Sequence, residues 1–217
     1  MNHARQEILD RIGVALSDVS DEDAQDIEVD YEYRRRPSRP LDAVSLTELF
    51  AERVRDYGAG VVHCRADEVA ESVDAACRKR ALRQLLYPPG LPAQWLPRDV
   101  EIVPDSGQTV TELERIGAAL TGCAAAISET GTLLLDGGAR CGRRAVTLVP
   151  DHHICVVQTE QIVAAVPEAL NSVVPAAIGE RRPVTLISGP SASSDIELTR
   201  VEGVHGPRDL LVIIAEG

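Results

Sequence analysis

A run of hydrophobic positions at helical spacing marks the start of a compact region near Ser45. Ser45 and Glu48 have the spacing of a capping box, which is typical of a helix N-terminus. The inward-facing positions of this helix recur three or four residues apart: Leu46, Leu49, Phe50, Val54 and Tyr57. Because Gly58 and Gly60 follow directly, the sequence predicts that the helix ends there.

Strand and helix patterns alternate in the next part of the chain. The sequence predicts a short buried strand at 61–64, a helix at about 67–82 and another strand at 100–103. Thr109 and Glu112 then form a second capping box, so a further helix begins there.

The pattern turns to strands at Ala124. Residues 124–138 predict a strand, a tight turn and a second strand, and residues 145–157 are rich in β-formers. Pro150 interrupts the second stretch because it cannot donate a ladder hydrogen bond.

The last third of the chain predicts one helix and two buried strands. Pro167 suits the first turn of a helix that runs through Val173. The strands at 184–188 and 210–215 are continuously apolar, which is typical of a sheet covered on both faces. The alternation of strands and helices therefore predicts an α/β domain with a mostly parallel sheet covered by helices.

The N-terminal segment has a different composition. Residues 4–17 predict a short amphipathic helix, and seven of the thirteen residues at 18–30 are acidic, which predicts a solvated linker. Four arginines at 34–39 form either an extended strap on an acidic body or a basic hook for a phosphate, a carboxylate or a partner. We therefore expect an arm over residues 1–43 and an α/β domain over residues 44–217.

Composition narrows the classes of function. The 217 residues are 44% apolar and 26% charged, which fits one globular domain plus an arm. The net charge of −12 argues against binding to nucleic acid or to an anionic membrane. Aromatic residues make up only 3%, so the chain lacks a platform for stacking single-stranded nucleic acid.

The termini and cysteines predict a cytoplasmic chain without a cofactor of its own. No long apolar run opens the sequence, so neither a secretory signal peptide nor a membrane span is expected, and thiols should stay unpaired. The cysteines are isolated, with no CxxC pair: Cys64, Cys77, Cys123, Cys141 and Cys155. A zinc ion or iron–sulfur cluster held by this chain alone is not expected.

Three polar segments stand out as candidate sites. The first is Ile127-Ser128-Glu129-Thr130-Gly131-Thr132, placed where two strands should turn. Glu129 is a candidate nucleophile or general base, and Thr130, Gly131 and Thr132 are candidate anion-binding residues. The alternative is a polar hairpin corner with a hydrogen-bonded glutamate.

The second segment is Asp151-His152-His153, which leads into an apolar strand. Because side chains alternate along a strand, Asp151 and His153 should share one face and His152 the other. His153 is a candidate titratable group, and Asp151 and His152 are candidate ligand-binding residues. The alternative is one core and one surface histidine. A zinc site would need His63 or His205 as a further ligand.

The third segment is 188–197, which follows a predicted strand. Ser194 and Glu197 have capping-box spacing, so a strand, a small-residue loop and a helix start would place free amides at the carboxyl end of a sheet. The candidate ligand-binding residues here are Gly189, Pro190, Ser191 and Asp195, with His205 and Gly206 in a nearby loop. The ligand classes left open are an anion, a sugar hydroxyl and a carbonyl, and the alternative is an ordinary capped helix. Neither a Walker A loop nor a GxGxxG fingerprint is present.

Together and in this order, the segments resemble the LUD-domain family, most closely its lactate utilisation protein C subfamily. The matching stretches are ISETGTLLLD, TLVPDHHICVV and GPSASSDIELTRVEGVHGPR, within residues 45–217. The resemblance implies a fold similar to the sugar-phosphate isomerase and CoA-transferase-like (NagB/RpiA/CoA transferase-like) superfamily. Ser128-Glu129-Thr130-Gly131 is also similar to the Ser-Glu-Asn-Gly stretch of CoA-transferases, in which the glutamate is catalytic.

The resemblance implies a role in bacterial oxidation of L-lactate to pyruvate. It implies a subunit without a cluster that works with iron–sulfur partner proteins and binds a small carboxylate or phosphate. Two alternatives stay open: a CoA-transferase-like or small-anion-processing enzyme that uses Glu129, and a ligand-sensing or assembly module without turnover. Whether the chain has its own catalytic activity, and its oligomeric state, are open at this point.

Overall fold

The computed structural model describes residues 3–17, 42–193, 201–202 and 206–217. The chain divides into two units, Met1–Arg34 and Arg35–Gly217, and each is described by itself. In the first unit, α1 (His3–Ala15) forms the expected short helix, and all of its residues are exposed. An ion pair one helical turn apart, between Arg11 and Glu7 at 2.8 Å, lies on its surface.

The second unit is built on a six-stranded parallel sheet. Its strands, in spatial order, are β1 (Gly60–Arg65), β12 (Asp209–Glu216), β7 (His152–Gln158), β4 (Ala118–Gly122), β2 (Gln84–Tyr87) and β3 (Glu101–Pro104). The predicted α/β class with a mostly parallel sheet is confirmed. β7 and β12 are apolar along most of their length because both faces of the sheet are covered.

A smaller sheet packs against the parallel one. Its strands, in spatial order, are β8 (Ile162–Val163), β5 (Ala125–Ile127), β6 (Thr132–Leu135) and β9 (Thr185–Ile187). β5 and β6 form the predicted antiparallel hairpin, and β9 pairs with β6, also antiparallel. A separate two-stranded ribbon joins β10 (Ala192–Ser193) and β11 (Val201–Glu202).

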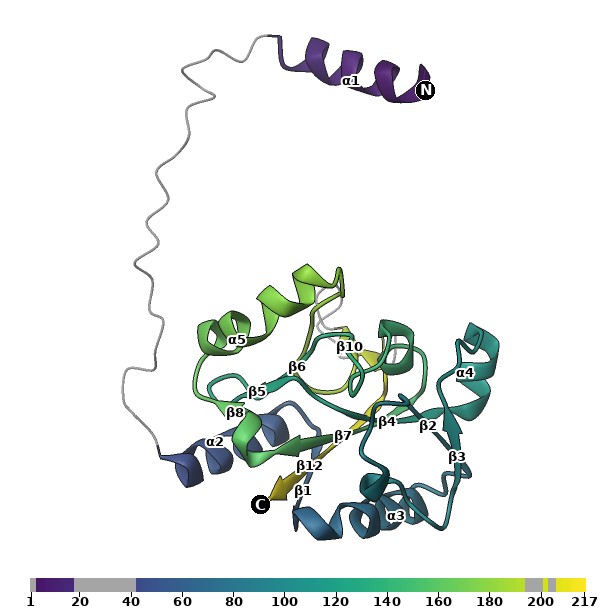
Figure 1. Ribbon diagram of the computed structural model, residues 1–217, viewed down its shortest axis with the longest axis vertical. Coiled ribbons are helices and arrows are strands. Elements are labelled where there is room, and N and C mark those ends of the chain that lie inside the picture. The colour runs from purple at the N-terminus through teal and green to yellow at the C-terminus, as the bar shows by residue number, and fades with distance from the viewer. Residues whose placement is uncertain (1–2, 18–41, 194–200, 203–205) are drawn as a thin grey trace. The chain divides into compact units, whose positions relative to one another are not determined.

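Helices and the small sheet cover the two faces of the parallel sheet (Figure 1). The helices are α2 (Ala43–Asp56), α3 (Val69–Lys79), α4 (Val110–Ile116) and α5 (Val166–Gly179), with single 3-10 turns η1 (Ala66–Glu68), η2 (Ala93–Trp95), η3 (Arg144–Thr147) and η4 (Thr159–Gln161). α3 covers one face of the parallel sheet, whereas α2, α4 and the small sheet cover the other. α5 covers the outer face of the small sheet.

Apolar side chains fill each of these interfaces. Phe50 and Val54 of α2 are buried against the face of β12 that carries Val212. Val69 of α3 is buried against the opposite face, next to Ile213. Complete burial of a side chain of this size contributes about 1.5–3 kcal/mol to stability. Because successive side chains of β12 point to opposite faces, this strand packs against both outer layers.

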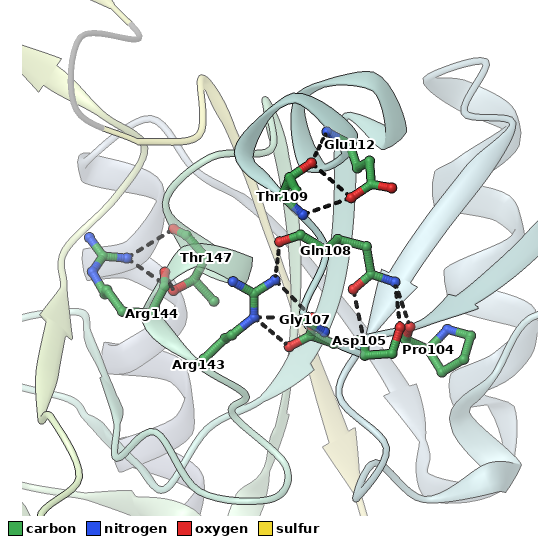
Figure 2. Close-up of polar contacts among 10 residues, drawn as sticks. Pro104, Asp105, Gly107, Gln108, Thr109, Glu112, Arg143, Arg144 and Thr147 are labelled. Atoms are coloured by element: carbon green, nitrogen blue, oxygen red, sulfur yellow. Dashed lines mark hydrogen bonds and ion pairs between the residues drawn. The ribbon is translucent and has the colours of Figure 1, made fainter.

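Several local predictions need correction. Asp42 caps α2 by accepting a 2.8 Å hydrogen bond from the Ser45 amide, so Ser45 is not the cap. The capping box of Thr109 and Glu112 is confirmed, and both of its side chains appear in Figure 2. The strand at 184–188 is not a buried member of the parallel sheet: β9 is a half-exposed edge strand, with Leu186 48% exposed.

The small second sheet and the strands β2 and β4 were not predicted. β2 lies directly before the segment Pro88-Pro89-Gly90, and β4 consists mostly of small residues, so neither has a strong strand pattern. Within the part of the chain that the structure describes, no helix is long and apolar enough to cross a membrane.

Candidate functional site

The first polar segment forms the corner between β5 and β6 and packs against α2. Ser128 is fully buried, and its hydroxyl donates to the Leu46 carbonyl oxygen at 2.8 Å. The amides of Ser128 and Glu129 donate to the carbonyl oxygens of Val163 (2.9 Å) and Ala164 (3.1 Å). The corner is therefore fixed both to the helix and to the neighbouring strand.

Gly131 permits the close approach of this corner to α2. It has a φ of +60°, and a Cβ atom at this position would lie 2.7 Å from the carbonyl carbon of Arg53. A larger residue would meet both backbone strain and a steric clash with the helix backbone. Glu129 lies at the same corner but its side chain is exposed, so a ligand can reach the carboxylate.

A chain of hydroxyl groups connects the first segment to the third. The Thr130 and Thr132 hydroxyl oxygens are 2.7 Å apart, and the Thr132 and Ser188 hydroxyl oxygens are also 2.7 Å apart. Thr132 is buried, so its hydroxyl is satisfied by these contacts rather than by water. The two segments thus meet at Ser188, which was not among the candidate site residues.

The third segment lies at the amino edge of the parallel sheet, and its predicted position at a carboxyl edge is wrong. Gly189, with a φ of +86°, approaches Tyr57, which precedes β1. The Ser191 amide donates to the Pro207 carbonyl oxygen at 2.8 Å, just before β12, and Gly206 lies beside Ser191. The reason is that β9 runs antiparallel to β6 and does not join the parallel sheet.

The remaining candidate residues of the third segment add little to the description of the site. Pro190 is half-buried, and the chain continues from Ser191 into the ribbon strand β10. Asp195 and His205 lie outside the described residues, as does the predicted capping box of Ser194 and Glu197.

The second segment occupies the same amino edge. The Asp151 carbonyl oxygen accepts hydrogen bonds from the amides of Arg208 (2.8 Å) and Asp209 (3.1 Å). His152 follows at the start of β7, with its Nδ1 atom 3.6 Å from an Asp209 carboxylate oxygen. This Nδ1 atom is buried and has no hydrogen-bond partner within the described chain.

Asp209 is paired mainly with Arg80. The Arg80 guanidinium donates to both carboxylate oxygens, at 2.8 and 2.9 Å. Burial alone would raise the pKa of Asp209, but the hydrogen bonds and charge of Arg80 outweigh it and lower the pKa. The cluster of Arg80, Asp209 and His152 is a partly buried ion pair with a histidine at its side.

His153 lies on the opposite face of β7, as the strand alternation predicted. Its side chain is 1% exposed, and Nε2 lies 2.8 Å from the Thr121 hydroxyl oxygen. Burial, together with the positive charge of Arg144, lowers the pKa of His153 to about 4. The imidazole is therefore neutral near pH 7, and the interpretation of His153 as a satisfied core histidine agrees with this geometry.

Hydrogen bonds thus bring the three segments into one neighbourhood without placing all candidates together. The first and third segments meet through Thr132 and Ser188, and the third and second are linked through residues 207–209. His153 is separate from these contacts because it faces the space between the sheets. In the described part of the chain, no three His, Cys, Asp or Glu side chains are arranged to hold a metal ion. All five thiols are unpaired, and four are buried.

Sequence reasoning missed Thr121, which contacts His153, and Arg144, whose charge acts on His153. Thr121 belongs to β4, a strand that was not predicted. Arg144 begins η3, in a stretch that has no acidic residue between Asp136 and Asp151. The sequence did offer one signal for Arg144: it is a cation in a stretch that contains no acidic residue to pair with it.

A separate hollow of about 380 Å³ lies at the carboxyl ends of β7 and β12. The first turns of α2, Thr159 and the ion pair of His63 with Glu216 line it. None of the predicted site residues that the structure describes lines this hollow. His63 pairs with Glu216, with 3.1 Å between Nδ1 and Oε1. In the described part of the chain it does not form a metal site with His152 or His153.

Comparisons with known proteins agree on one family. The LUD-domain model matches residues 47–215. A lactate utilization protein C from Deinococcus radiodurans is 47% identical over 176 residues, covering 81% of this chain and 82% of that protein. A protein of the same name from Halalkalibacterium halodurans is 34% identical over 110 residues, covering 49% and 47%. The crystal structure of a DUF162 family protein from Deinococcus radiodurans has a TM-score of 0.70 and 40% identity, covering 82% of this chain and all of that chain.

The close approach at Gly131 predicts a large loss of stability in Gly131→Ala. Gly107 is the matched control, because it also has a positive φ (+92°) but a Cβ atom at this position would have no neighbour within 4 Å. Urea denaturation should show a loss of about 1 kcal/mol for Gly107→Ala and at least a further 1–3 kcal/mol for Gly131→Ala. Equal losses in the two variants would contradict the proposed packing of the corner on α2.

The burial of neutral His153 predicts loss of stability in acid. Because its pKa is lower in the folded chain than in the unfolded one, unfolding takes up a proton between pH 6.5 and about 4. The free energy of unfolding is unaffected by this proton uptake above pH 6.5. It falls by roughly 3 kcal/mol as the pH is lowered to about 4. His153→Gln, which can keep a hydrogen bond to Thr121, should show a clearly flatter pH dependence of the free energy of unfolding. An unchanged pH dependence in this variant would contradict the burial of a neutral imidazole.

Proposed function

Because the chain belongs to the LUD-domain family, we propose that it is a cytoplasmic component of a bacterial L-lactate utilisation system. The observation that carries this proposal is the 47% identity to a lactate utilization protein C over about four-fifths of both chains. All of the predicted site residues lie within the matched residues 47–215.

The chain acts in the oxidation of L-lactate to pyruvate as a subunit without a redox centre of its own. In this reaction the C–H and O–H bonds at the hydroxyl-bearing carbon break and a C=O bond forms, releasing an electron pair and protons. The electron pair passes to iron–sulfur clusters of partner proteins. The cysteines of this chain support the division of labour, because four of the five are buried and they offer no set of accessible thiolates.

The polar corner supplies a reacting or proton-accepting group, the Glu129 carboxylate. An exposed carboxylate at Glu129 stands on a turn fixed by hydrogen bonds, and the same turn carries Thr130 and Thr132, whose hydroxyls connect to Ser188. A rigid support is what a reacting or proton-accepting side chain requires. This arrangement also favours the second candidate function, acyl transfer through Glu129.

A strain lacking this chain is expected to lose growth on L-lactate while it keeps growth on pyruvate. The reason is that pyruvate bypasses the oxidation step. Growth rates with each carbon source, with and without a restored wild-type copy, measure the effect. Normal growth of the deletion strain on L-lactate would overturn the proposal. Purification of a tagged copy from lactate-grown cells should also recover partner proteins that contain iron and acid-labile sulfide.

Glu129→Gln is expected to restore growth on L-lactate poorly, because it removes the charge at the corner and little volume. Glu160→Gln is the matched control, since Glu160 is exposed on η4, outside the predicted site. Equal restoration by the two variants would remove Glu129 from the site. Incubation with acyl-CoA followed by borohydride tests the second function, since a glutamyl thioester would leave a reduced residue at position 129 in peptide mass spectra.

A further inference from the structure

Two adjacent arginines before and within η3 have different partners (Figure 2). Arg143 donates through Nε and Nη2 to the Asp105 carboxylate, at 3.0–3.1 Å, and through Nη2 to the Gln108 carbonyl oxygen at 2.8 Å. The Asp105 side chain is only 9% exposed. This bidentate pair ties the start of η3 to the loop after β3 and fixes the backbone from which Arg144 extends.

Arg144 has only neutral partners. Its Nη1 atom donates to the carbonyl oxygen of Thr147 at 3.1 Å and to the Thr147 hydroxyl at 3.0 Å. Across the residues that the structure describes, its Nε and Nη2 atoms have no hydrogen-bond partner, and no carboxylate lies within ion-pair distance. The edge of the guanidinium formed by Nε and Nη2 is thus available to a ligand.

The environment of Arg144 makes its positive charge costly. The side chain is half-buried, and this burial lowers its pKa, although a guanidinium stays protonated in proteins. A partly desolvated cation without an anion nearby loses hydration, and the two neutral contacts with Thr147 replace only part of it. A bound anion would supply that compensation.

His153 responds to the charge of Arg144 from within the core. The imidazole is fully buried against Thr121, and Arg144 is the charged group of the described chain that lowers its pKa in addition to burial. Arg144 on η3 thus has an available guanidinium edge, and it lies near enough to the neutral imidazole on β7 for its charge to act there. Arg144 lies outside the three segments that the sequence marked as candidate sites, and His153 is separate from the contacts that join them.

We propose that Arg144 anchors a small monocarboxylate beside His153, through its Nε and Nη2 atoms. The two parallel N–H groups of this edge match the two oxygens of a carboxylate. A single guanidinium balances a monoanion such as L-lactate or pyruvate, whereas a phosphate dianion would remain undercompensated. The choice of ligand rests on the proposed function, but the site itself rests on the geometry.

Binding of a carboxylate has a measurable consequence for His153. The anion would cancel the positive charge that disfavours protonation of the imidazole, so occupancy should raise the pKa of His153. By linkage, protonation of His153 and binding of the anion should favour each other. An Arg144 that served only to hold η3 would produce no such response.

The test uses the purified full-length chain with L-lactate, pyruvate or inorganic phosphate as the added probe. Calorimetry measures the dissociation constant, and NMR titration of the histidine resonances measures the pKa of His153, with His153→Gln providing the assignment. The wild type should bind both carboxylates more tightly than phosphate and should show a raised pKa of His153 at saturation. Arg144→Gln should weaken carboxylate binding by at least about tenfold and abolish the ligand-dependent shift.

The matched control is Arg140→Gln, which removes the same charge from an exposed arginine that contacts Gln158. It should retain both the affinity and the shift. If Arg144→Gln does not fold, Arg144→Lys keeps the charge and removes the bidentate edge, and weakened binding is again expected. Equal binding by wild type and the Arg144 variants, tighter binding of phosphate, or an unchanged pKa of His153 at saturation would overturn the site.

The role in lactate utilisation and the Arg144 site can be refuted independently of each other. Loss of growth on L-lactate in the deletion strain, without binding of lactate or pyruvate to the purified chain, would keep the role in lactate utilisation and refute the Arg144 site. Binding that depends on Arg144, with normal growth of the deletion strain, would keep the site and refute the role.

Discussion

The fold depends on the burial of β7 between two parallel neighbours, β12 and β4. Strand alternation directs His153, Cys155 and Val157 toward the small sheet and α2, and directs Ile154 and Val156 toward α3. A shift by a single residue would exchange these faces and place His153, with Cys155 and Val157, among the residues that pack on α3. The position of the buried imidazole is therefore set by the same constraint that fills both cores.

The polar groups that enter the core are paired in ways that connect separate layers. Ser128 joins the hairpin corner to α2, Thr132 joins the corner to Ser188, and Thr121 joins β4 to His153 on β7. Each pair satisfies a buried polar atom whose desolvation would otherwise cost about 1–3 kcal/mol. Arg144 differs from these residues because its charge has no anionic partner in the described chain. That difference is the basis for assigning it to a ligand.

Sequence patterns predicted those elements that depend mainly on residues close together in the chain. The cap at Thr109, the turn at Gly131 and the apolar strand β12 all depend on neighbours in the chain. β4 was missed because its small residues carry little strand pattern, and burial beside β7 decides its conformation.

The location of the site depended more on tertiary structure. The third segment was expected at a carboxyl edge because the strand before it was assigned to the parallel sheet, but β9 pairs with β6 instead. Arg144 could not be recognised as different from Arg143 by sequence, because only the fold places Asp105 beside one of them. The resemblance to the LUD-domain family, by contrast, was visible in the sequence because it rests on ordered motifs along most of the domain.

Two places in the molecule compete for a small anion: the region beside Arg144 and His153, and the hollow lined by His63 and Glu216. The hollow carries a carboxylate already paired with its histidine, whereas Arg144 has an available edge. The most direct measurement is a difference electron-density map from crystals grown with and without L-lactate. The account predicts a carboxylate on the Nε and Nη2 atoms of Arg144. Lactate bound in the hollow, with Arg144 unchanged, would contradict it.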